Sequence, residues 1–196
     1  MVLKLKDFRL HSSLRKTLVK FARASHCRIR VDSAFGEVIK GCATTSREGQ
    51  DGTWIVPAMI DAYIDFHLAG FAHSVETWVN EELVGGLYFV AIGKAVFGES
   101  MFHRVSDSSK VALAALVSMC RHFSIDQIDC QQNTRHLTSL GAREIGRHAF
   151  TCAVSQRAAE PAPHWDFSSR YWREMGIPVG GESDMLPETG VERIPE

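Results

Sequence analysis

The residues with the clearest chemical potential are a carboxylate and an amide two positions apart, Asp129 and Gln131, in the segment IDCQ. We predict a strand over residues 125–131, in which these two side chains project to one face and Cys130 to the other. A carboxylate placed in this way can hydrogen-bond an attacking amine and accept or relay its proton, while the amide orients either reactant. The alternative is structural, because an Asp-Gln pair at a strand end also caps a helix or satisfies local backbone groups. These two residues alone favour the structural interpretation.

A third candidate is Glu99, which lies between apolar neighbours in FGESMF. A glutamate in such a place is either a surface residue at a strand end or a buried carboxylate with a function. Metal and disulfide chemistry are not indicated, because the five cysteines form no C-x-x-C pair and the nine histidines form no H-x-x-x-H or H-E-x-x-H pattern. Gly85-Gly86 interrupts a strand pattern with no helix directly after it, which indicates a close approach of the backbone to a bound substrate rather than a phosphate loop.

Several periodic segments must position these residues. Helices are expected over residues 12–23, 34–42, 57–69, 109–122, 134–140 and 146–157, and strands over 28–32, 72–79, 82–92, 94–98 and 125–131. The strands 72–79 and 82–92 are close enough in sequence to form an antiparallel hairpin. This order predicts an α+β fold with a mixed, mainly antiparallel sheet flanked by helices.

The overall composition is that of a soluble globular protein. The chain has 196 residues, of which 45 % are hydrophobic and 23 % charged. No apolar run approaches the roughly 18 residues needed to cross a bilayer, and the first residues lack the apolar region of a signal peptide. We therefore expect a cytosolic protein with no membrane partner.

The charge is distributed unevenly, although the formal net charge is only −1. The first 30 residues are strongly basic, and residues 160–196 carry an excess of carboxylates. Within the helix expected over 12–23, Lys16, Lys20 and Arg23 share one face. This stripe is either a solvated basic face or a set of phosphate contacts.

Six short motifs follow one another between residues 73 and 145. They are HSVETW (73–78), ELVGGLYFVAIG (82–93), FGESMF (97–102), SSKVAL (108–113), IDCQ (128–131) and HLTSLGAREI (136–145), and they are preceded by AFGEVIKGCA (34–43) and GTWI (52–55). A single GES or GG means little, but in this order and at this spacing the chain resembles the leucyl/phenylalanyl-tRNA–protein transferase family.

The resemblance implies a GNAT-like acyltransferase fold and a reaction without a cofactor. The expected enzyme moves Leu, Phe or Met from aminoacyl-tRNA to the α-amine of proteins with N-terminal Arg or Lys, and so marks them for degradation. Aminoacyl-tRNA is already an activated ester, so positioning, charge stabilisation and proton transfer suffice. The chain lacks the Q/R-x-x-G-x-G/A run that holds coenzyme A, which argues against acetyl transfer.

The resemblance also assigns roles to individual residues. Asp129 and Gln131 belong to the reaction centre, and Glu99 lies beside the aminoacyl group and terminal adenosine of the donor. The donor side chain is expected in an apolar pocket of Leu87, Met101, Leu116 and Ile128, for which core packing is the alternative. Trp54 is expected to stack on the adenosine, and Arg15, Lys16, Lys20 and Arg23 to contact tRNA phosphates.

We expect three regions: a basic N-terminal helix region (1–30), a GNAT-like catalytic domain (31–157) and an acidic, partly disordered tail (158–196). Family members begin with an additional segment ending in a W-W-S-P-D-P-R-like run, which contributes an aromatic contact to the donor. Since Met1–Leu3 corresponds to the residues just after that run, we expect an N-terminally truncated member. Two alternatives stay open: a catalytically impaired tRNA-binding module, and a Fem-like tRNA-dependent aminoacyltransferase, which shares the fold but not these motifs.

Overall fold

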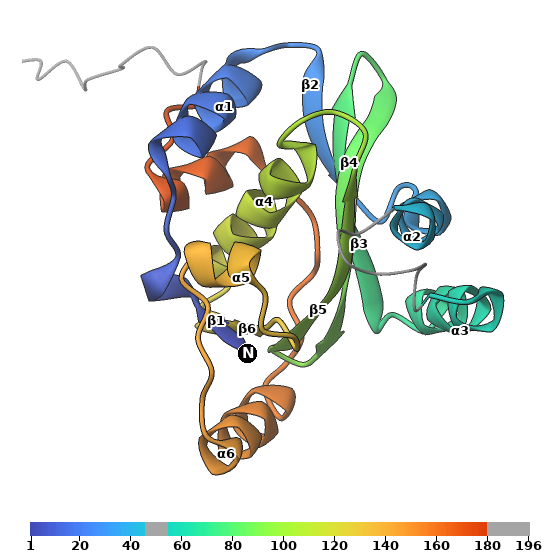
Figure 1. Cartoon of the computed structure of the whole chain (residues 1–196), viewed down its shortest axis with the longest axis vertical. Helices are drawn as coiled ribbons and strands as arrows, with labels where there is room; N and C mark the ends of the chain where they lie inside the picture. The colour runs from blue at the N-terminus through green and yellow to red at the C-terminus, as the bar shows by residue number, and fades with distance from the viewer. Residues whose placement is uncertain (46–54, 180–196) are drawn as a thin grey trace, which may run out of the picture.

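The computed structural model describes residues 1–45 and 55–179, in which a six-stranded sheet carries helices on both faces (Figure 1). The strands are β1 (Val2–Lys4), β2 (Cys27–Val31), β3 (Ala72–Val79), β4 (Glu82–Ile92), β5 (Ala95–His103) and β6 (Gln127–Asp129). Their order across the sheet is β1-β6-β5-β4-β3-β2, and every pair is antiparallel except β5 with β6. The predicted α+β class with a mixed, mainly antiparallel sheet flanked by helices is confirmed.

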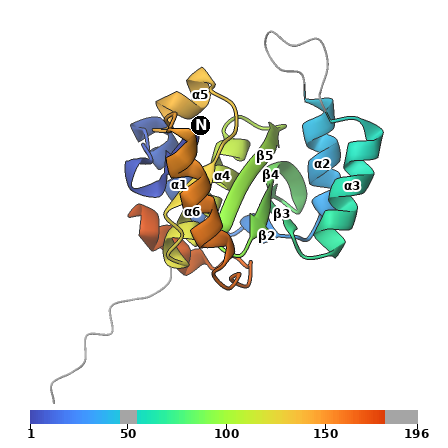
Figure 2. The ribbon, with the colours of Figure 1, turned by 90° about the horizontal axis from the view of Figure 1, so that it is seen from below.

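The helices divide between the two faces of the sheet. They are α1 (Ser12–Arg23), α2 (Phe35–Thr44), α3 (Pro57–Leu68), α4 (Ser108–His122), α5 (Arg135–Ser139) and α6 (Arg147–Ala158), with the 3-10 helices η1 (Leu5–Asp7) and η2 (Ser169–Met175). Helix α4 packs on one face with α1 and η2 beyond it, whereas α2 and α3 cover the other face (Figures 1 and 2). The apolar core is divided in the same way, into one cluster around α4 and another beneath α2 and α3. Among the described residues, no helix is both long and apolar enough to cross a membrane.

The hairpin of β3 and β4 lies between β5 and β2 in the sheet and has the predicted bounds. Its two turn residues, Asn80 and Glu81, both have positive φ, at 51° and 62°. Such a turn has the twist that adjacent antiparallel strands require. The hairpin therefore presents one long face to α4 and the other to α2 and α3.

The glycine pair in β4 allows close packing inside the protein itself. A Cβ atom at Gly85 would overlap the Oγ of Ser108, the first residue of α4, and one at Gly86 would lie 2.9 Å from the carbonyl oxygen of Val75 on β3. Gly85 is thus required for the seating of α4 on the sheet and Gly86 for close packing against β3, while an approach of this backbone to a bound substrate stays a prediction.

Candidate active site

Strands β5 and β6 meet where the three polar candidates lie. Phe97 on β5 is in parallel register with Asp129, the last residue of β6. Between Phe97 and Glu99 stands Gly98, where a Cβ atom would lie 3.5 Å from the carbonyl oxygen of Asp129. A Cβ atom there would make only an ordinary van der Waals contact, so the register of β5 with β6, and not the glycine, places the two segments that carry the carboxylates side by side.

Asp129 and Gln131 are not arranged as the strand pattern predicted. Strand β6 ends at Asp129, and Gln131 has a left-handed backbone conformation with φ 57°. The Oδ1 atom of Asp129 accepts a hydrogen bond from the backbone N–H of Gln131 at 2.9 Å. The predicted strand over 125–131 is therefore present only over Gln127–Asp129, and the prediction that both side chains share one strand face is wrong, because this local turn ends the strand. The other carboxylate oxygen, Oδ2, has no hydrogen-bond partner among the described residues.

Cys130, between these two residues, is not suited to act as a nucleophile. Burial raises the pKa of its thiol to about 11, with a smaller contribution from the negative charge of Asp129. At neutral pH the sulfur is therefore protonated, and the thiolate that would react is scarce. Chemistry at this junction depends on the oxygen and nitrogen groups.

Glu99 lies at an irregularity in β5. Tyr88 on β4 pairs with Ser100 and Phe89 pairs with Gly98, so Glu99 is the extra residue of a β-bulge. The hydroxyl of Tyr63, on α3, donates a hydrogen bond to Glu99 Oε2 at 3.0 Å. Glu99 is half-buried, and the bulge turns its side chain toward the face that α3 covers.

Tyr63 is a site residue that the sequence reasoning missed. Burial and, to a smaller extent, the charge of Glu99 and their hydrogen bond raise the pKa of Tyr63, so its hydroxyl remains a donor. The only signal in the sequence was a tyrosine on the side of the 57–69 helix that carries Ile60 and Ile64. That pattern indicates packing and does not identify Glu99 as the partner.

The two carboxylates share one face of the sheet. Ile128 belongs to the cluster around α4, and the next residue, Asp129, projects to the opposite face by strand alternation. Asp129 also lines a small cavity between the sheet and α6, together with Phe97, Phe150 and Arg157. Glu99 therefore lies toward α3, and Asp129 lies toward α6.

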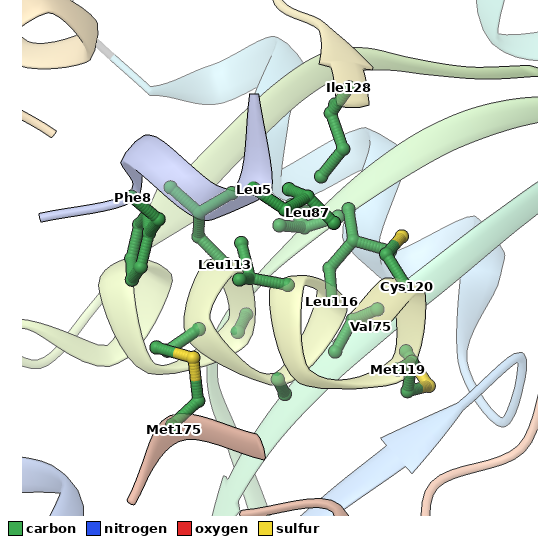
Figure 3. Close-up of a cluster of buried hydrophobic side chains, with 14 of the residues drawn as sticks. Leu5, Phe8, Val75, Leu87, Leu113, Leu116, Met119, Cys120, Ile128 and Met175 are labelled. Carbon is green, nitrogen blue, oxygen red and sulfur yellow. The ribbon is translucent and has the colours of Figure 1, made fainter. Parts of the chain in front are cut away.

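The four expected pocket residues lie together on the α4 side. Leu87, Leu116 and Ile128 are buried in the cluster around α4, with exposed fractions of 4 %, 1 % and 1 %, and Met101 packs against it. Figure 3 shows Leu116 projecting from α4 toward the side on which Leu87 and Ile128 lie. In this structure the four side chains are packed core residues, so a guest side chain would have to displace part of that packing.

The remaining candidates are Trp54 and the basic residues of α1. Trp54 lies outside the described residues. On α1, Lys16, Lys20 and Arg23 are exposed and have no ion-pair or hydrogen-bond partner within the described part of the chain. Arg15 differs from them, because its guanidinium donates to the carbonyl oxygen of Gly176 at 2.6 Å and to that of Met175 at 3.5 Å. It anchors α1 to the end of η2.

Comparisons with known proteins find relatives that match most of the chain. Residues 2–155 match the family model described as leucyl/phenylalanyl-tRNA protein transferase. A leucyl/phenylalanyl-tRNA–protein transferase of Albidiferax ferrireducens is 57 % identical over 178 residues, which are 91 % of this chain and 70 % of the relative. One from a Polaromonas species is 55 % identical over 187 residues, covering 95 % of this chain and 72 % of the relative. A solved structure of L-PGS from Bacillus licheniformis superposes with a TM-score of 0.48 at 13 % identity, over 85 % of this chain and 56 % of that one.

Proposed function

The chain belongs to the leucyl/phenylalanyl-tRNA–protein transferase family, and from this premise we propose that it transfers Leu, Phe or Met from aminoacyl-tRNA to the α-amine of proteins that begin with Arg or Lys. The observation that supports this most is the family match over residues 2–155, since the matched region contains Glu99, Asp129 and Gln131. The transfer would mark the acceptor protein for degradation.

The reaction exchanges an ester for an amide. The acceptor nitrogen attacks the carbonyl carbon of the aminoacyl ester, the C–N bond forms, and the C–O bond to the terminal ribose breaks. A proton leaves the nitrogen, and a proton reaches the ribose oxygen. A free α-amine has a pKa of about 7.7–8.0, so a useful fraction is already neutral at physiological pH.

We assign the proton transfer to Asp129. Its Oδ1 is held by the Gln131 N–H, which leaves Oδ2 to accept a hydrogen bond from the amine and to relay its proton. The side chain of Gln131 is exposed at the same turn and orients either reactant. Glu99, with one oxygen fixed by Tyr63, has its other oxygen for the donor's ammonium or a ribose hydroxyl.

The apolar cluster supplies donor selectivity in this proposal. Filling a pocket made by Leu87, Met101, Leu116 and Ile128 with a Leu or Phe side chain is worth about 1.5–3 kcal/mol. One methylene separates competing substrates by only about 1–3 kcal/mol, so a deformable wall such as Met101 admits Leu, Phe and Met together. Trp54 is assigned to the adenosine by the family resemblance, and the basic stripe of α1 to tRNA phosphates.

The decisive experiment measures transfer of radiolabelled leucine from Leu-tRNA to a protein that begins with Arg, using the chain and its Asp129→Asn variant. Asn retains an Oδ1 acceptor for the Gln131 N–H but cannot take a proton, so the turn is kept and the rate should fall by roughly 10²–10⁴-fold. Asp126→Asn is the matched control, because Asp126 is exposed in the same segment and pairs with Arg157.

An acceptor that begins with Ala tests the Arg or Lys specificity and should receive no leucine. Transfer that is unaffected by Asp129→Asn would remove Asp129 from the reaction centre. Binding of Leu-tRNA without any transfer would show a tRNA-binding module instead of a transferase.

A further inference from the structure

Helix α3 is apolar around most of its circumference, yet none of its residues is buried. Helices of this composition are normally enclosed by a core or a membrane. The inner side of α3 packs through Ile60, Tyr63 and Ile64 on the core beneath α2. Its outer side exposes Phe66 and Leu68, at 41 % and 78 % of their surfaces. The outer apolar side therefore has no cover among the described residues.

We call the exposed large apolar residues and the exposed carboxylates of α3 and its flanks the α3 surface. It consists of Val56, Asp61, Asp65, Phe66, Leu68 and Phe71, all exposed. The rings of Phe66 and Phe71 lie 5.4 Å apart, which joins the helix to the start of β3. Figures 1 and 2 show α3 as an outermost element of its side of the molecule.

The charge of the α3 surface limits the kind of partner that it can bind. No lysine or arginine occurs between Arg47 and Lys94, whereas Asp61 and Asp65 are exposed on α3. The one histidine of the helix, His67, turns inward and stacks on the ring of Phe35. An apolar surface whose charged groups are carboxylates repels the phosphates of tRNA and complements a cationic polypeptide.

The α3 surface is also directly connected to the candidate active site. Tyr63, which holds Glu99, is on the same helix, and Phe66 lies one turn further along. Helix α1, which carries the basic stripe, lies on the opposite face of the sheet from α3 (Figure 2). A polypeptide on the α3 surface can thus reach the carboxylates without crossing the face that carries the basic stripe.

We propose that the α3 surface docks the acceptor polypeptide, an unfolded cationic segment whose N-terminal residue extends toward Glu99 and Asp129. Its following apolar residues pack on Phe66 and Phe71, and its positive charges lie near Asp61 and Asp65. This inference rests on the proposed function, because it concerns the acceptor of that reaction. It assigns to α3 a specificity for the residues of the acceptor that follow its N-terminal residue.

The test compares two acceptors that differ in length: an unfolded polypeptide that begins with Arg, and an arginyl dipeptide that lacks the following segment proposed to pack on the α3 surface. Phe66→Ser should raise the KM for the polypeptide roughly three- to ten-fold and leave its kcat and both constants for the dipeptide unchanged. The double variant Asp61→Asn, Asp65→Asn should raise the same KM roughly two- to five-fold, with the difference vanishing at high salt. Fluorescence anisotropy of the labelled polypeptide reports the docking without any transfer.

Matched controls are Val105→Ser, an exposed apolar residue after β5, and Glu82→Gln, an exposed carboxylate at the start of β4. Both should behave as the wild type. Unchanged polypeptide affinity in the α3 variants overturns the proposal, as does a kcat loss shared by both acceptors, which indicates damage to Glu99. If the wild type is a dimer that Phe66→Ser dissociates while the KM for the polypeptide is unchanged, the α3 surface binds a second copy of the protein. That result also overturns the proposal. Absence of transfer with anisotropy intact would reject the proposed function while the docking stands.

Discussion

Tyr63 gives Glu99 a fixed orientation that no sequence motif indicates. The two residues are 36 positions apart, and the hydroxyl of Tyr63 donates to Oε2 of the carboxylate at 3.0 Å. Because the pKa of Tyr63 is raised, this donor persists through neutral and mildly alkaline pH. The second oxygen, Oε1, has no hydrogen-bond partner among the residues that the structure describes. A carboxylate with one oxygen held and one free is well suited to position a substrate ammonium or hydroxyl.

Removing only the hydroxyl of Tyr63 tests this role. In Tyr63→Phe the ring still packs on Tyr88, 5.0 Å away between centroids, and one hydrogen bond to a carboxylate is lost, so the free energy of unfolding should fall by no more than about 1.5–3 kcal/mol. The kcat/KM for leucine transfer should fall roughly ten-fold, because hydrogen bonds to charged groups are among the stronger ones. Initial rates and urea unfolding measure the two effects. Tyr171→Phe, on η2 across the sheet, is the control, and wild-type rates in both variants would show that Tyr63 does not orient Glu99.

The junction of β3 with α2 depends on a buried carboxylate, Glu76, which is fully inaccessible to solvent. Its Oε1 accepts hydrogen bonds from the backbone N–H of Ala34 and from Ser74 Oγ, both at 2.8 Å. Its Oε2 accepts from Ser33 Oγ and from Trp78 Nε1. Four donors satisfy the charge, and one of them belongs to the N-cap position of α2. This network holds α2 against the sheet and supports the core beneath α2 and α3.

Replacing Glu76 by Gln keeps the shape of the side chain but turns one hydrogen-bond acceptor into a donor. One carboxylate oxygen becomes an amide NH₂ that faces donors, so at least two hydrogen bonds disappear in a buried place. We expect the free energy of unfolding in urea to fall by about 2–4 kcal/mol. The surface variant Glu82→Gln should lie within about 0.5 kcal/mol of the wild type. A Glu76→Gln protein as stable as the control would mean that the network adds no net stability.

Elements with strong periodicity were predictable from the sequence, and short or irregular ones were not. The helix over 12–23 and the hairpin strands 72–79 and 82–92 have the predicted bounds, because many residues repeat one pattern there. The strand expected over 94–98 extends to His103, since the bulge at Glu99 breaks its alternation. The three-residue strand β1 and the 3-10 helix η2 were missed, because their pairing and packing depend on distant parts of the chain.

The candidate site was predictable in residue identity but not in geometry. The motifs pointed to Asp129, Gln131 and Glu99, and the structure brings the strand segments that carry them together at the junction of β5 and β6. The turn at Gln131 was not foreseen, because its positive φ is rare for glutamine and has no pattern in the sequence. The hydrogen bond of Tyr63 with Glu99 was missed for a similar reason, since it joins two elements whose approach only the fold determines.

At the scale of the whole molecule, helices α1 and α3, on opposite faces of the sheet, carry exposed charges of opposite sign. Helix α1 presents Lys16, Lys20 and Arg23 on one side, and α3 presents Asp61 and Asp65 on the other (Figures 1 and 2). A net charge of −1 conceals this division. Two substrates of opposite charge can therefore be received on separate faces, with less competition for one surface.

The basic stripe of α1 predicts that the KM for Leu-tRNA depends on the salt concentration. In the triple variant Lys16→Gln, Lys20→Gln, Arg23→Gln, the KM for Leu-tRNA should rise while kcat at saturation stays unchanged, because these residues bind phosphates and not the reacting atoms. Counterion release should reduce the slope of log KM against log salt by about 0.9 for each phosphate that is no longer neutralised, hence by roughly 2–3 in total. Steady-state transfer from about 50 to 200 mM salt measures it at a fixed acceptor concentration. Lys40→Gln, an exposed lysine on α2, is the control, and an unchanged slope in the triple variant would assign phosphate binding to another surface.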